Sequence, residues 1–185
     1  MNKFFVEIGA ANFDTLLPLA KNGWSGYVFE PIPHLYDDCV AKFKDYDVQV
    51  FPIAISDFNG TAKMAVARPH GDKDWRTGCS HITHKNHLGF RANIHPKRSG
   101  DFEGEIEVPC LTLDEALKGH SGNIDFMKID TEGHENNIIQ SYSFKIKPKF
   151  LKIEHKHVDD IYLSLKLTEN GYLVWKEKDD IYAII

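Results

Sequence analysis

The chain has 185 residues, of which 42% are hydrophobic and 26% are charged, and its formal net charge is −5. This length and composition predict one globular domain over residues 1–185 and exclude a disordered chain. The acidic balance disfavours nucleic acid as a partner, and no apolar stretch reaches the ~20 residues of a membrane-spanning helix.

The features that bear on location favour the cytoplasm. The opening residues, MNKFFVEIG, run straight into a predicted strand without the long apolar segment of a secretory signal. The three cysteines, Cys39, Cys79 and Cys110, have no CxxC spacing. Such cysteines are typical of free thiols in a reducing compartment. We therefore expect a cytoplasmic protein with no membrane partner.

Predicted strands and helices alternate along the chain. Strands are predicted at 3–8, 26–30, 48–55, 61–67, 105–111, 124–130 and 149–154, and helices at 13–22, 34–44, 112–118, 135–142 and 158–170. This alternation predicts an α/β fold with a mostly parallel sheet and helices on both faces. The chain closes with strands at 172–178 and 180–185, which a tight Asp-Asp turn joins as an antiparallel hairpin. Pro52 favours an edge position for the third strand.

The first strand leads into EIGAANFDT, residues 7–15, at the edge of the sheet where ligands bind in such folds. A dinucleotide site uses several glycines, whereas this loop has only Gly9. We interpret the loop as a site for S-adenosylmethionine, a nucleoside that carries a sulfonium and an amino-acid tail. A helix N-terminus after the loop would hold the carboxylate of that tail. The candidate donor-binding residues here are Glu7, Gly9, Ala10, Ala11, Asn12 and Thr15.

The ends of the next two predicted strands supply further candidates. Glu30 ends the second strand, where a carboxylate accepts the ribose hydroxyls of either NAD or S-adenosylmethionine. The alternative for Glu30 is an exposed acid at a strand end, and Pro31 follows it. Ser56 and Asp57 are expected beside the adenine, and the small residues 78–80 are a further candidate for contact with donor or acceptor. Three such strand ends together favour S-adenosylmethionine.

Five blocks of sequence carry a resemblance to a known family. In chain order they are FVEIGAANFDT, VFEPIP, AISDFNG, LTLDEAL and IDFMKIDTEGHE. The set resembles FkbM-type S-adenosylmethionine-dependent methyltransferases, whose KIDxEGxE signature is similar to residues 128–135, and the resemblance covers about residues 4–155. It implies a Rossmann-like class I methyltransferase fold with a seven-stranded sheet, and methyl transfer that is usually to oxygen. The chain departs from the family's GAxxG loop, since Asp14 or its neighbour replaces the second glycine.

Methyl transfer to a hydroxyl requires removal of the hydroxyl proton, by a base or with the help of a metal ion. Asp130 and Glu154 end neighbouring predicted strands about 5 Å apart, so we expect them to converge with His155 near the donor. This set resembles the divalent-metal site of catechol-type O-methyltransferases and would suit magnesium or manganese. The alternatives are a metal-free base, either Asp130 or His155, and structural roles such as capping the helix at 135 or pairing with Lys128 and Lys152. Asp130 is also a candidate donor-binding residue.

The turn that follows Asp130 contains two more acids and a histidine. Glu132 is expected to brace the turn, and Glu135 to cap the following helix, because acids are favoured in a first helical turn. His134 and His157 are expected to face solvent.

Residues 63–98 concentrate eight lysines and arginines and five histidines in an otherwise acidic chain. We interpret residues from about 63 to 104 as an insertion on the acceptor side, whose charge suits an anionic acceptor such as a phosphorylated or uronic-acid sugar. The alternatives are a solvated surface loop and a zinc site at His81, His84 and His87.

The leading function is O-methylation of a hydroxyl on a saccharide or other small metabolite. A non-catalytic module that binds S-adenosylmethionine or a nucleotide is the alternative from another class, and an NAD-dependent enzyme is a third. N-methyl transfer is disfavoured, because residues 130–132 offer no aromatic wall for an amino group. A second copy of the chain can complete the acceptor site of so small a domain, so homodimerisation is a further hypothesis.

Overall fold

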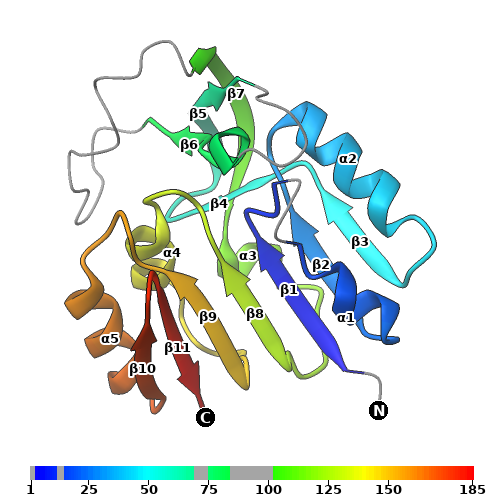
Figure 1. The fold of residues 1–185 in the computed structure, drawn as a ribbon. Coiled ribbons are helices and arrows are strands. Elements are labelled where there is room, and N and C mark those ends of the chain that lie inside the picture. The colour runs from blue at the N-terminus through cyan, green and yellow to red at the C-terminus, as the bar shows by residue number, and fades with distance from the viewer. Residues whose placement is uncertain (1–2, 12–14, 69–74, 84–101) are drawn as a thin grey trace.

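The computed structural model of the chain describes residues 3–11, 15–68, 75–83 and 102–185. Its larger sheet has seven strands in the order β10-β11-β9-β8-β1-β2-β3 (Figure 1). They are β1 (Phe4–Ile8), β2 (Ser25–Phe29), β3 (Val48–Phe51), β8 (Phe126–Ile129), β9 (Phe150–Glu154), β10 (Leu173–Glu177) and β11 (Asp180–Ile184). Every pair from β9 to β3 is parallel, so the carboxyl ends of these strands share one edge of the sheet.

β11 runs against its neighbours. It pairs antiparallel with both β9 and β10, which confirms the predicted closing hairpin. The turn itself differs from the prediction: Asp180 already pairs with Glu177, so the turn residues are Lys178 and Asp179. Lys178 has a φ of 55°, as the tight turns of such hairpins require.

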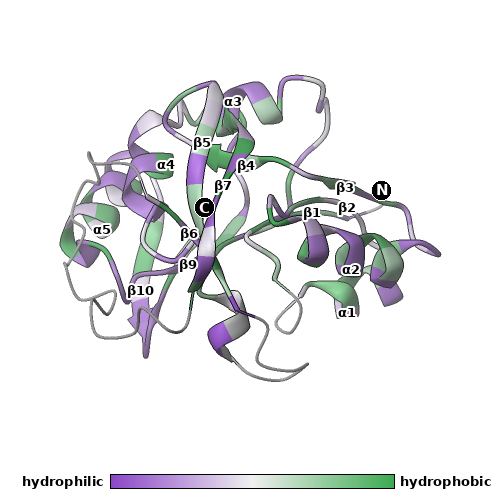
Figure 2. Cartoon of the chain, turned by 90° about the horizontal axis from the view of Figure 1, so that it is seen from above, coloured by the Kyte–Doolittle hydropathy of each residue, from purple (hydrophilic) through white to green (hydrophobic). Residues whose placement is uncertain are grey.

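Helices cover both faces of the large sheet. α1 (Leu17–Lys21) and α2 (Pro33–Phe43) lie on one face, which we call the α2 face, and α3 (Leu113–Ala116) and α4 (Glu135–Ser141) lie on the other, the α4 face (Figure 2). α5 (Asp160–Glu169) packs beside α4. Thr112 accepts a hydrogen bond from the backbone N–H of Glu115 and so caps the start of α3.

The core follows the two-residue alternation of the strands. Phe5 and Val28 point to the α2 face and pack with Cys39 and Phe43 of α2. The residues that alternate with them point to the α4 face and form the largest buried cluster; from the strands these are Val6, Ile8, Phe29, Met127, Ile129, Leu151, Ile153, Ile181 and Ala183. On each strand, the face on which a residue lies therefore follows from its position relative to these core residues.

A second sheet lies above the carboxyl ends of β1 and β2 (Figure 1). Its four strands have the order β4-β7-β5-β6, with bounds β4 (Ala54–Ser56), β5 (Gly60–Ala67), β6 (His81–Ile82) and β7 (Phe102–Thr112). A short 3-10 helix, η1 (Trp75–Gly78), precedes β6. The predicted strands at 61–67 and 105–111 are thus paired with each other, as antiparallel neighbours outside the large sheet.

The strand predicted at 48–55 is wrong as a single element. Its first half is β3, the edge strand of the large sheet, and its second half is β4, which pairs with β7 in the second sheet. Pro52 lies between them and has no backbone N–H, so the ladder with β2 ends at Phe51. The edge position predicted from Pro52 is confirmed, whereas the change of sheet was not predicted.

Among the described residues, the helices on the α2 face, α1 and α2, lie over β1, β2 and β3 (Figure 1). Over β8, β9, β10 and β11, aromatic side chains pack against one another: Phe126 stacks on Phe150, and Trp175 stacks on Tyr182 with ring centroids 5.6 Å apart. Trp175 is 41% exposed. Within the described ranges, no helix has the length and apolar character that crossing a bilayer requires.

Candidate functional site

An open cavity lies beyond the carboxyl ends of β1, β2 and β8; together with the open solvent at its mouth its space is about 680 Å³. Of the residues predicted to bind the donor, the cavity is lined by Gly9, Ala10, Ala11, Glu30, Pro31 and Asp130. The second sheet and its loops contribute Met64, Gly78, Ser80 and Ile82, so part of the predicted insertion does border the cavity.

The turn after β1 approaches the end of β8 very closely. Gly9 has a φ of 75°, and its N–H donates to the carbonyl of Phe29 at 3.0 Å. A Cβ atom at position 9 would lie 1.8 Å from the carbonyl oxygen of Asp130. Only glycine fits at position 9, because another residue would be strained at this φ and its Cβ would overlap the carbonyl oxygen of Asp130. The single glycine of the loop therefore permits the close approach between this turn and the end of β8.

Glu30 lies buried in the wall of this cavity. Its side chain accepts hydrogen bonds from the N–H of Ala11 and the N–H of Ile32, both at 2.9 Å. Burial raises the pKa of Glu30 to about 7, although these amides act to lower it. The carboxylate therefore fixes the loop of β1 against β2. The alternative of an exposed strand-end acid is wrong, because Glu30 is 4% exposed.

A buried lysine, Lys128, links the ends of β1 and β8 beside the cavity. The Nζ of Lys128 lies 3.7 Å from Glu7 and 3.6 Å from Asp130, and Lys128 lines the cavity. Glu7, which is fully buried, also accepts the N–H of Leu16 at 2.8 Å, just before α1. Glu7 thus lies behind the cavity wall. The pairing of Asp130 with Lys128 was one of the structural alternatives for Asp130, and Lys128 itself was not predicted to line the site.

Two other residues of the first loop were predicted to bind the donor. Thr15 borders a separate groove, together with Leu16 and Trp24. Asn12 lies outside the described residues.

Ser56 and Asp57 do not lie where the sequence placed them. Ser56 is fully buried, with its Oγ 2.6 Å from Nε2 of His134, and Asp57 accepts a hydrogen bond from the side chain of Asn137. These contacts join β4 to α4, and the cavity is lined instead by the preceding residues 53–55. The cause is the change of sheet at Pro52, which directs the end of β4 toward α4.

The same contacts correct the prediction for His134, which is 2% exposed rather than facing solvent. The turn from 130 to 135 reverses two further predictions. Glu135 braces the turn: its carboxylate accepts from the N–H and hydroxyl of Thr131 and from the N–H of Gly133. Burial raises the pKa of Glu135 to about 7. Glu132, with a φ of 55°, instead points its carboxylate to the cavity side.

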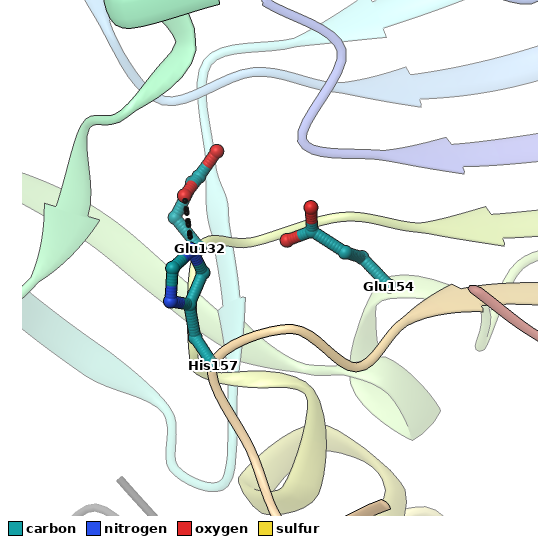
Figure 3. Close-up of side chains that lie close together, drawn as sticks. All are labelled: Glu132, Glu154 and His157. Carbon is teal, nitrogen blue, oxygen red and sulfur yellow. Dashed lines mark ion pairs between the residues drawn. The ribbon is translucent and has the colours of Figure 1, made fainter. Parts of the chain in front are cut away.

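The acid and histidine groups that meet at this end of the cavity are Glu132, Glu154 and His157 (Figure 3). One ligand atom from each lies within 4.8 Å of the others, and Nε2 of His157 is 3.4 Å from Oε2 of Glu132. Burial raises the pKa of Glu154 to about 9, with further contributions from Asp130, Glu132 and Glu135. His157 is therefore an ion-pair partner and not simply a solvent-facing histidine.

The predicted set of Asp130, Glu154 and His155 is not brought together as a cluster of this kind among the described residues. Successive residues of an extended chain point to opposite faces. Glu154 points toward Glu132 and His157 (Figure 3), so the next residue turns away from them. His155 acts instead on Asp160 at the start of α5, whose pKa is lowered chiefly by a hydrogen bond from Lys176 and also by His155.

The family follows from the sequence as a whole. The family model described as the methyltransferase FkbM domain matches residues 7–174. The chain belongs to the FkbM methyltransferase family. The resemblance of the five sequence blocks is thus confirmed, and so is the class I methyltransferase fold, since the large sheet has its strands in the expected arrangement.

Several solved structures are similar to this chain at low sequence identity. The fibrillarin/Nop5p complex matches with a TM-score of 0.50 and 11% identity, over 98% of this chain and 71% of that chain. The ribosomal protein L11 methylase from Lactobacillus delbrueckii subsp. bulgaricus has a TM-score of 0.48 and 9% identity, over 99% and 69%. Magnesium protoporphyrin IX methyltransferase from Synechocystis PCC 6803, with bound SAM, has a TM-score of 0.44 and 9% identity, over 99% and 70%. A search of curated proteins found no match.

In this FkbM methyltransferase the signature residues 128–135 do three different things. Lys128 and Asp130 line the cavity, Glu135 holds the turn, and Glu132 reaches His157. The sequence predicted that this segment carries the chemistry. It did not predict the roles of the individual acids, because these depend on which way each side chain leaves a tight turn.

Proposed function

We propose that this FkbM methyltransferase uses S-adenosylmethionine and methylates a hydroxyl group of a saccharide or another small metabolite. The family match and the class I fold support methyl transfer. In such open α/β sheets, ligands bind beyond the carboxyl ends of the strands, which is where the cavity lies.

The observation that carries the proposal is the position of Glu30. An ionised carboxylate has about four acceptor positions, and Ala11 and Ile32 each occupy one. Acceptor capacity thus remains in the cavity wall for the ribose hydroxyls of the donor. Gly9 leaves a small floor between β1 and β8, and no second glycine is required, because the donor brings no pyrophosphate.

The proposed reaction is an in-line displacement at the methyl carbon of the donor. A lone pair of the acceptor oxygen forms the new C–O bond, while the C–S bond breaks and its electrons remain on sulfur as a neutral thioether. The proton of the hydroxyl passes to a base. We assign this role to Asp130, whose side chain is 30% exposed at the cavity. His155 is not assigned a part, because it is not among the residues that line the cavity.

The acceptor is proposed to be anionic. Support comes from the basic character of residues 63–98, of which the described residues Met64, Gly78, Ser80 and Ile82 line the cavity. The lysines and arginines of such a segment would favour a phosphorylated or uronic-acid sugar over its neutral counterpart. The proposed location is the cytoplasm, where the donor and such acceptors are both available.

A transfer assay with methyl-labelled S-adenosylmethionine tests the proposal. Acidic sugars, sugar phosphates and their neutral counterparts are offered as acceptors, and label in the acceptor is measured together with formation of S-adenosylhomocysteine. We expect label in a hydroxyl of an anionic acceptor. Asp130→Asn should lose transfer, by about 10²–10⁴-fold for a general base, and keep donor binding.

Unchanged turnover of Asp130→Asn would remove Asp130 as the base. Donor binding without transfer to any hydroxyl acceptor would favour the non-catalytic binding module instead.

A further inference from the structure

We propose that Glu132, Glu154 and His157 form a binding site for a divalent transition-metal cation beside the cavity, whose wall includes Glu132. The three ligand atoms already lie within 4.8 Å of one another (Figure 3). Metal–ligand bonds of about 2.0–2.2 Å place ligand atoms roughly 3 Å apart, so modest side-chain movement would close the site.

The three ligands come from separate places in the fold. Glu132 lies in the turn after β8, Glu154 is the last residue of β9, and His157 lies in the turn before α5. In Figure 3 the carboxylate of Glu154 points toward the pair formed by Glu132 and His157. Both turns are anchored independently: Glu135 holds the first by three hydrogen bonds, and Asp159 caps α5 by accepting two backbone N–H groups.

A second observation points to a missing ligand. The Oε2 atom of Glu154 is buried and has no hydrogen-bond partner within the described part of the chain. A buried carboxylate oxygen without a donor is costly, and native structures rarely leave one. A cation between Glu132 and Glu154 would supply the partner that this oxygen lacks among the described residues.

The donor set indicates the class of ion. Two carboxylate oxygens and one imidazole nitrogen suit Mn²⁺, Fe²⁺, Co²⁺ or Zn²⁺ better than Ca²⁺ or Mg²⁺, which prefer oxygen ligands alone. Three protein ligands also leave coordination positions open for a substrate. Because Glu132 lines the cavity, these positions would face the place where an acceptor arrives.

The role of the ion rests on the proposed function: the cation would bind the acceptor hydroxyl and favour its deprotonated form, while Asp130 takes the proton. The existence of the site does not depend on that function. Cation binding is measured without methyl donor, and donor binding is measured without the cation, so failure of one proposal is distinguishable from failure of the other.

The test is titration of the chelator-treated chain with Mn²⁺, followed by the loss of the electron paramagnetic resonance signal of the free ion. We expect saturable binding of one Mn²⁺ per chain. Glu132→Gln, Glu154→Gln and His157→Gln should each weaken binding by at least about tenfold. His155→Gln is the matched control, since it removes the neighbouring imidazole on the other face, and should bind as the unaltered chain does.

Three results would overturn the proposal. The first is no binding at millimolar Mn²⁺. The second is binding that persists in all three ligand variants. The third is binding that His155→Gln loses and His157→Gln keeps, which would restore the ligand set predicted from the sequence. Circular dichroism of each variant identifies any that has failed to fold, and the conclusion then rests on the remaining ligand variants.

Discussion

Glu30 is the residue on which the donor site depends most directly. Its carboxylate is buried, yet it accepts backbone N–H groups from two loops. Burial raises its pKa to about 7, so near neutral pH the free protein contains both protonated and ionised forms. A donor whose ribose hydroxyls donate to Glu30 binds the ionised form more tightly. Binding must then lower this pKa and release a proton.

The first prediction concerns pH. Below pH 7 the affinity for S-adenosylmethionine should fall as the pH is lowered, by up to about 1.4 kcal/mol per pH unit, because Glu30 must first lose its proton. Above about pH 8 this dependence should level off. Calorimetric titrations at pH 6, in two buffers of different ionisation enthalpy, should show proton release.

Glu30→Gln is the matched control for this prediction, because it cannot ionise. Titration of the donor's own groups is common to both proteins, so the difference between them reports Glu30. An identical pH profile in the two proteins would show that Glu30 does not receive the ribose hydroxyls.

Gly9 gives a second residue-scale prediction. Gly9→Ala places a Cβ 1.8 Å from the carbonyl oxygen of Asp130 at a φ of 75°, whereas Gly23→Ala, at a φ of 80°, meets no atom within 4 Å. In both variants, left-handed backbone strain should lower the free energy of unfolding by about 1–2 kcal/mol. Gly9→Ala should lower it further, by at least about 1 kcal/mol, because the two loops must separate. Equal losses in denaturant unfolding would contradict the close approach.

At the scale of elements, the turn between β8 and α4 positions both halves of the site. Asp130 before it lines the cavity and Glu132 within it reaches His157, while the carboxylate of Glu135 holds the turn from inside. In the family signature, the bracing acid Glu135 therefore lies three residues after Glu132, the acid that it positions.

Glu135→Ala should lower the free energy of unfolding by roughly 2–3 kcal/mol, because the N–H groups of Thr131 and Gly133 lose their acceptor in a buried turn. Glu169→Ala, an exposed acid near the end of α5, serves as the control and should change it by less than about 0.5 kcal/mol. A loss for Glu135→Ala no larger than that of the control, in denaturant unfolding, would remove the bracing role.

The elements show what local sequence does and does not determine. The strand, turn and helix around residues 124–142 were predicted because apolar periodicity, Gly133 and the following helix agree with one another. The segment at 48–55 was predicted as one strand, since both halves are apolar and extended. Its division between two sheets depends on β7, more than 50 residues away, which offers β4 a pairing partner that no local pattern reveals.

For the molecule as a whole, the sequence predicted the order of strands and helices along the chain and the edge of the sheet at which the site lies. Gly9, Glu30 and Asp130 meet at one cavity because the carboxyl ends of parallel strands share an edge. It did not predict which face each strand-end residue takes. Glu154 and His155 are adjacent in sequence, but only Glu154 lies in the cluster with Glu132. The histidine of this cluster is His157, two residues after His155.

The second sheet explains why the acceptor side was the least predictable part. Met64, Gly78, Ser80 and Ile82 reach the cavity through pairings among β5, β6 and β7, so their arrangement depends on non-local contacts. The residues that do not line the cavity in spite of the prediction, Ser56 and Asp57, serve to join this sheet to α4.

We infer that the cavity beside Gly9 and Glu30 binds a sulfonium nucleoside and not a dinucleotide. Calorimetric titration of the chain with S-adenosylmethionine and, separately, with NAD tests this inference. We predict saturable binding of S-adenosylmethionine, weakened by about 1–3 kcal/mol in Glu30→Gln, and no binding of NAD. Binding of NAD, or of neither ligand, would contradict the account.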